Sequence, residues 1–190
     1  TVAIDAFPED ISLMVDSDWL SLAALIPAIE AGVDVTINPV ETPTSELTYR
    51  SFGEGFIITG YTGGKTGVIL PSAIDGKPVL AVDKDALSGL IYCDLPNSIT
   101  TLMDGALTNC PDLRWLYGGE GIVDASRYAV EGTAWAKDQY IVSLGSVLLA
   151  YQTSASQIDL DGQYPIIGDE AFRDLNTVRY INMQGVTTIG

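Results

Sequence analysis

The stretch IDLDGQYPIIGDEAF, from Ile158 to Phe172, decides the fold, because a degenerate copy of it, CDLPNSITTLMDGAL, runs from Cys93 to Leu107. Corresponding residues of the two copies lie 65 positions apart, and the same offset carries the frame onward to Val178 from Leu113. Self-similarity of this kind is typical of a solenoid, in which one small unit is stacked on the next. We therefore expect function to lie on an extended surface rather than in a pocket.

A third copy, VILPSAIDGKPVLAVDKDAL, runs from Val68 to Leu87 and is longer than the others. Its first Pro lies 25 positions before Pro96, whereas its final Leu lies only 20 positions before Leu107. The five extra residues fall around positions 75–78, where Gly and Pro stand. Because Gly and Pro mark turns, the excess predicts an inserted turn that leaves the frame intact.

The string from Ile158 to Phe172 resembles the BspA-type leucine-rich repeat of bacterial surface proteins, whose unit reads roughly LxxIxIPxxVxxIGxxAFxxC. EGTAWAKDQYIVSLGSVLLAY, at positions 131–151, resembles the hairpin insertion common in that family, as does ELTYRSFGEGFIITGYTGG near position 46. The resemblance covers about residues 46–190. The departures from the unit weaken single turns and not the frame: Leu87 and Leu107 replace Phe, and Met103 and Asp83 replace Gly.

The resemblance implies an α+β repeat solenoid, a leucine-rich-repeat-like stack of short strands and turns or short helices. We expect the solenoid to occupy residues 46–190, with a hairpin insertion near 131–151. Small Ala residues should let neighbouring coils approach at the tight turns around Ala86, Ala106 and Ala171. The last coil looks truncated, so either the native protein continues or an open strand edge is left that should attract another chain.

Residues 1–45 lie outside the repeat frame, and we expect them to form an N-terminal cap, a helix plus a linker. The helix would begin near Trp19, be interrupted by Pro27 and end at Gly32. An apolar helix suits a cover over the first coil of a repeat stack. Alternating residues from Val33 to Ile37 then predict a short strand. The alternative is that residues 1–45 are the remnant of an upstream domain.

Composition fits a folded, acidic chain. Of the 190 residues 47% are hydrophobic, and the formal net charge is −16. Nine Asp or Glu precede Arg50, and no Lys or Arg does. Because nucleic acids are held by clustered Lys and Arg, nucleic acid is a poor partner. We interpret the acidity as a device that keeps a secreted protein soluble, and a specific cationic partner is the alternative. The most apolar run, Trp19 to Ile29, is too short to span a membrane, so we expect no membrane insertion.

The sequence holds few of the residues that carry chemistry. His is absent, which removes the commonest general base and the usual zinc sites, and we expect no cofactor and no metal. Cys93 and Cys110 are explained by packing, while a disulfide between them stays an alternative in an oxidising compartment. Three acidic pairs could imitate the carboxylates of a glycosidase, and each has a structural explanation: Asp83 with Asp85, Asp159 with Asp161, and Asp169 with Glu170.

Alternation along the first strand of each coil predicts which side chains face solvent. Val68, Cys93, Leu116, Ile158 and Ile181 point inward, and so do Leu70, Leu95, Gly118, Leu160 and Met183. The aromatic residues Tyr92, Trp115 and Tyr180 share one outward ladder. The candidate binding residues lie on or beside this ladder: Tyr92, Asp94, Arg114, Trp115, Tyr117, Arg179, Tyr180 and Asn182. Trp115, Tyr117 and Tyr180 would be the anchors, because aromatic residues and Arg dominate interface energetics.

Two interpretations of these aromatic residues stay open. They could bind a partner, or they could merely stabilise cross-strand pairing. We expect a non-enzymatic, extracellular or surface-attached binding module, for which the resemblance implies adhesion to host proteins, host cells or other microbes. The alternatives are a carbohydrate-binding accessory module of a secreted hydrolase and a structural spacer.

Overall fold

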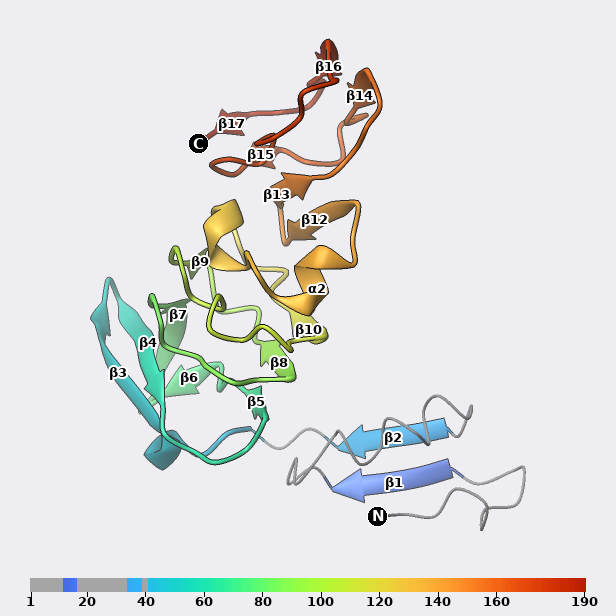
Figure 1. Ribbon diagram of the computed structural model, residues 1–190. Coiled ribbons are helices and arrows are strands. Elements are labelled where there is room, and N and C mark those ends of the chain that lie inside the picture. Colours follow the sequence, from blue (N-terminus) through green and yellow to red (C-terminus); the bar gives the residue numbers. More distant parts are fainter. Residues whose placement is uncertain (1–11, 17–33, 39–40) are drawn as a thin grey trace.

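A computed structural model describes residues 12–16, 34–38 and 41–190 of the protein, the first two ranges as backbone only (Figure 1). The chain forms a β-solenoid of about six turns. One set of strands builds the first wall of the coils. It consists of a parallel sheet in the order β10-β8-β5 and a separate parallel pair, β14-β16. These strands are β5 (Gly67–Ile69), β8 (Tyr92–Leu95), β10 (Trp115–Gly118), β14 (Gln157–Asp159) and β16 (Tyr180–Asn182).

The register of these strands confirms the repeat frame. Cys93 pairs with Val68 on one side and with Leu116 on the other. In the separate pair, Ile158 lies opposite Ile181. Because equivalent residues stack in parallel strands, the inward positions form one row within the β10-β8-β5 sheet and a second row within the separate pair.

A second set of strands builds the other wall of each coil. One sheet runs in the order β11-β9-β7-β4-β3, and a further sheet runs β12-β13-β15-β17. The first contains β3 (Leu47–Phe52), β4 (Gly55–Tyr61), β7 (Lys77–Val82), β9 (Thr101–Leu102) and β11 (Asp124–Ala125). The second contains β12 (Ile141–Leu144), β13 (Val147–Tyr151), β15 (Ile166–Ile167) and β17 (Thr188–Ile189). The antiparallel pairs β3–β4 and β12–β13 are the two predicted hairpins.

The inserted turn also lies where the spacing of the copies predicts it. β6 (Ala73–Ile74) folds back on the start of β7 in an antiparallel pair. Asp75 and Gly76 form the turn between them with φ of 49° and 75°. Both values are left-handed, a conformation that Gly and Asp tolerate best.

The α+β description is not supported, because the described residues contain almost no helix. The helical segments among them are α2 (Ala134–Lys137), η2 (Thr44–Glu46) and η3 (Arg127–Ala129). The segments around Ala86, Ala106 and Ala171 are turns. The residue before each of these Ala has a left-handed backbone: φ is 58° at Asp85, 83° at Gly105 and 63° at Glu170. An α-helix cannot contain such a residue, so each segment stays a single turn.

Most of the predicted N-terminal cap lies outside the described residues, and so does its helix from Trp19 to Gly32. The helical cap is therefore not supported. The predicted short strand is confirmed as β2 (Asp34–Asn38), which pairs in parallel with β1 (Ser12–Asp16). Farther on, Thr42 lies along the edge of the first coil. Its amide donates to the Ile69 carbonyl at 2.8 Å, and its hydroxyl accepts from the Ile69 amide at 3.0 Å.

The core is a spine of inward residues with small Ala at the turns. Val68, Cys93, Leu116 and Ile158 are all buried, as are Ala86, Ala106 and Ala171. Cys93 and Cys110 are buried, free thiols, and burial raises the pKa of both. The prediction for Met183 is wrong: this residue is exposed, because it directly follows β16, which among the described strands pairs with β14 alone. Among the described residues no helix is long and apolar enough to cross a membrane.

Candidate functional site

The outward side of the β10-β8-β5 sheet carries a small apolar cluster. Ile69 and Tyr92 are buried there, and the partly buried Trp115 packs against them. Tyr92 lies directly opposite Trp115 in the register of β8 and β10. The sequence predicts Tyr92 and Trp115 to face solvent, and they do lie outside the main core, but neighbouring side chains cover Tyr92. We call Ile69, Tyr92, Asp94, Trp115 and Tyr117 the aromatic face.

Tyr117 is the most exposed aromatic residue of this face. Its side chain is 52% exposed, whereas that of Tyr92 is only 9% exposed. The two rings lie 5.5 Å apart between centroids, with their planes inclined by 36°. Such tilted pairs of aromatic rings are favourable. Tyr92 therefore supports the ring of Tyr117, which presents its other side to solvent.

Asp94 adds a carboxylate to the aromatic face. It pairs with Tyr117 in the register of β8 and β10, and the Tyr92 hydroxyl donates to Asp94 Oδ2 at 3.4 Å. Burial raises the pKa of Asp94, the Tyr92 hydroxyl opposes that rise, and the nearby Glu120 carboxylate adds to it. Burial and the negative charge of Asp94 raise the pKa of Tyr92 in turn. None of the groups that shift the pKa of Asp94 is a cation.

The single aromatic ladder predicted from the sequence is wrong, because it is split in two. Tyr92 and Trp115 belong to one sheet, but Tyr180 lies in the separate β14–β16 pair, opposite Gln157. The hairpin β12–β13 interrupts the stack between β10 and β14.

Tyr180 is 59% exposed and is flanked by the exposed Arg179. Asn182 is half-buried and donates from Nδ2 to Asp159 Oδ1 at 2.9 Å. Arg114 is exposed beside Trp115.

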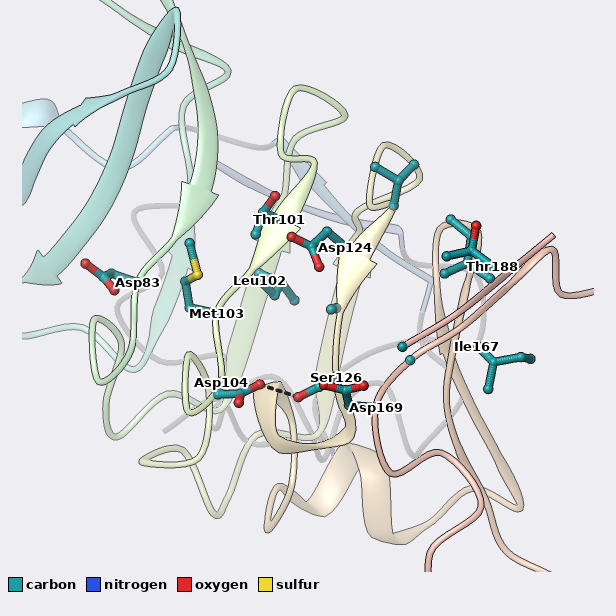
Figure 2. A pocket seen from close by; sticks show the side chains of 15 residues that line it. Asp83, Thr101, Leu102, Met103, Asp104, Asp124, Ser126, Ile167, Asp169 and Thr188 are labelled. Carbon is teal, nitrogen blue, oxygen red and sulfur yellow. Dashed lines mark hydrogen bonds between the residues drawn. The ribbon is translucent and has the colours of Figure 1, made fainter. Parts of the chain in front are cut away.

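A groove that is not predicted from the sequence crosses the second wall of the solenoid. It has a volume of about 470 Å³ and is lined by residues of β9, β11, β15, β17 and the turns that follow them. Figure 2 shows Asp104, Ser126 and Asp169 gathered at one end and Thr101 beside Asp124 farther along. Among the described residues that line the groove, four are Asp and none is Lys or Arg.

Two of the carboxylates in the groove have partners inside the protein. Arg50 donates to Asp83 at 2.9 Å, and this hydrogen bond lowers the pKa of Asp83. The Ser126 hydroxyl donates to Asp104. Asp124 and Asp169 are exposed. A signal for part of the groove was present in the sequence, since Asp104 and Asp169 both stand two positions before the buried Ala of their turns.

In two of the three acidic pairs that could imitate a glycosidase, carboxylates accept hydrogen bonds from groups within the protein. Asp85 accepts from Asn109 Nδ2 at 2.9 Å, and Asp83 is bound to Arg50. Asp159 accepts from Asn182 Nδ2 and from the Asp161 amide at 3.1 Å. Asp169 and Glu170 form a turn rather than the start of a helix. In the described ranges no three His, Cys, Asp or Glu side chains gather closely enough to hold a metal ion.

Comparison with known proteins identifies the fold. The chain is similar to a leucine-rich repeat protein of T. pallidum, with a TM-score of 0.55 and 22% identity over 80% of this chain and 82% of that one. It is also similar to a leucine-rich repeat protein from Bacteroides ovatus, with a TM-score of 0.50 and 16% identity over 76% of this chain and 41% of that one. No family model and no curated protein matches. The chain therefore has the leucine-rich repeat fold, as the resemblance to BspA-type repeats implied.

Proposed function

We propose that this leucine-rich repeat chain is a non-enzymatic protein-binding module that contacts its partner through the aromatic face. The observation that carries the proposal is the placement of Tyr117, half-exposed at the surface and supported from below by the buried ring of Tyr92. A ring held in this way offers a large contact area and loses little conformational entropy when it binds. Trp115 extends the same surface from the neighbouring position of β10.

The resemblance to repeats of bacterial surface proteins supports an extracellular location and a role in adhesion to host proteins, host cells or other microbes. The leucine-rich repeat fold of the similar structures supports protein binding rather than catalysis. Residues 1–45 act in this proposal as a cover for the first coil. The exposed Tyr180 and Arg179 form a second contact region, separated from the aromatic face by the inserted hairpin.

The acidic groove is an alternative contact surface, and one experiment distinguishes it from the aromatic face. The protein is screened against arrays of extracellular host and microbial proteins and, in parallel, against a glycan array. Every positive is then measured with Tyr117→Ala, with Tyr140→Ala as a matched control, because Tyr140 is 82% exposed and lies outside the aromatic face. Asp124→Ala reports on the groove.

The proposal predicts a protein partner whose affinity falls with Tyr117→Ala and is unchanged by Tyr140→Ala and Asp124→Ala. Loss of affinity with Asp124→Ala alone would move the contact to the groove. Binding to glycans without any protein partner would favour the carbohydrate-binding alternative, and the absence of both kinds of ligand would favour a structural spacer.

A further inference from the structure

Asp94 and Asp159 hold the same position in the repeat, 65 residues apart, and differ in what surrounds them. Asp159 accepts hydrogen bonds from Asn182 Nδ2 at 2.9 Å and from the Asp161 amide at 3.1 Å. Asp94 accepts one long hydrogen bond, from the Tyr92 hydroxyl at 3.4 Å. The carboxylate of Asp159 is thus satisfied within its own coils, whereas that of Asp94 has one weak and neutral donor.

Gly118 of β10 approaches Asp94 closely and has no side chain to cover its carboxylate. A Cβ atom at position 118 would lie 2.9 Å from Asp94 Oδ1. Tyr117, the residue before Gly118, pairs with Asp94 across the two strands. Paired residues of parallel strands project from the same side of the sheet, so the ring of Tyr117 and the carboxylate of Asp94 border one space.

This combination matches the chemistry of a cation. The face of an aromatic ring is negative and attracts ammonium and guanidinium groups. A half-buried carboxylate with one weak donor gains most from a charged hydrogen-bond donor, since charge-assisted hydrogen bonds are about twice as strong as neutral ones. The nearby carboxylate of Glu120 adds to the negative potential, and the net charge of −16 attracts a cationic partner over a longer range.

We propose that the aromatic face binds a lysine or arginine side chain of its protein partner, with the cationic group held between the Asp94 carboxylate and the ring of Tyr117. The inference rests on the proposed function and adds the chemistry that the partner must present there.

The test uses the full chain labelled with ¹⁵N and a capped tetrapeptide that contains two arginines. We expect amide signals of Asp94, Tyr117 and Gly118 to shift as the peptide is added, and a peptide with two glutamates in place of the arginines to leave them unchanged. Asp94→Asn should weaken binding about tenfold, because a charge-assisted hydrogen bond to the carboxylate is replaced by a neutral one. Tyr117→Ala should weaken it by a smaller factor.

Asp159→Asn is the matched control, because it removes the same charge at the equivalent position of another coil. It should change the affinity less than twofold, which is the scatter expected at a distant site. Equal weakening by the two Asn variants would mean that the peptide senses only net charge, and the inference would be overturned. Absence of shifts at the three amides would overturn it as well.

The same variants separate this inference from the proposed function. A protein partner that loses affinity with Tyr117→Ala but not with Asp94→Asn would support the aromatic face as the binding surface. It would overturn the inference that this surface binds a cation. A partner that is insensitive to both changes would contradict the proposed surface itself. Circular dichroism of each variant verifies that the fold is intact.

Discussion

The ring of Tyr117 rests on the ring of Tyr92, with centroids 5.5 Å apart, and the two residues differ sharply in exposure. They belong to adjacent strands, yet one faces solvent and the other is covered. Each of the two interpretations of the aromatic residues therefore applies to one member of this pair. Tyr92 contributes to the pairing of the strands, and Tyr117 is available for contact with a partner.

This division predicts losses of stability of different size for two substitutions. Tyr92→Ala should lower the free energy of unfolding by about 2 kcal/mol, because it empties a covered site against Ile69 and Trp115. Tyr117→Ala should cost at most about 1 kcal/mol, the worth of one aromatic contact at the surface. Urea unfolding followed by tryptophan fluorescence measures both. Equal losses would show that Tyr117 is as structural as Tyr92.

The repeat frame itself predicts a second difference, between Leu107 and Phe172. They hold the same position of the unit, but Leu107 is fully buried and Phe172 is only half-buried near the end of the stack. Leu107→Ala should cost about 2–5 kcal/mol of unfolding free energy, the range for deleting a buried leucine. Phe172→Ala should cost less, although its side chain is larger.

Thermal and urea unfolding of these two variants provide the measurement. A larger loss for Phe172→Ala would mean that the last coil packs as tightly as the middle ones. Val123→Ala is a suitable control, since Val123 is 50% exposed and surface substitutions usually change stability by no more than about 0.5 kcal/mol.

The sequence predicts the frame well because burial repeats with it. Val68, Cys93 and Leu116 were expected to stack and do so. The α+β description failed, because the segments predicted as turns or short helices are turns. Asp85 and Glu170 have a left-handed backbone there, which leaves no mark in hydrophobic periodicity.

The candidate site was less predictable than the frame. Alternation places Tyr92 and Tyr180 on one side of the coils but does not reveal that a hairpin separates their strands. The groove brings together Asp83 and Asp169 from different coils. The repeat frame relates their positions, but it does not show that a groove lies between them.

Gly118 supplies a prediction about the edge of the aromatic face. Its φ is 68°, and an added Cβ atom would collide with the Leu95 carbonyl oxygen. Gly118→Ala should therefore cost more than the roughly 1–2 kcal/mol of a left-handed alanine alone. Gly76→Ala is the matched control, because Gly76 has a φ of 75° and nothing within 4 Å of the added atom. Urea unfolding of both variants isolates the collision, and equal losses would argue against it.

Asp94 links the binding surface to the dependence of stability on pH. Burial and the negative charge of Glu120 raise the pKa of Asp94 in the folded chain, against the smaller effect of the Tyr92 hydroxyl. The folded protein therefore retains this proton to a higher pH than the unfolded chain does. The resulting contribution to stability is fully present below the pKa of an unfolded aspartate, about 3.9, and is lost as the pH rises through the raised pKa.

Asp94→Asn should thus be more stable than the natural protein at pH 7 and lose that advantage at pH 3, where both side chains are neutral. Urea unfolding at the two pH values measures the difference, and Asp159→Asn serves as the control because its carboxylate has two strong donors. An Asn variant that is less stable at pH 7 would mean that the Asp94 carboxylate holds the coil together. A gain in stability would instead show that the chain keeps a destabilising charge at its surface, as expected of a residue retained for binding.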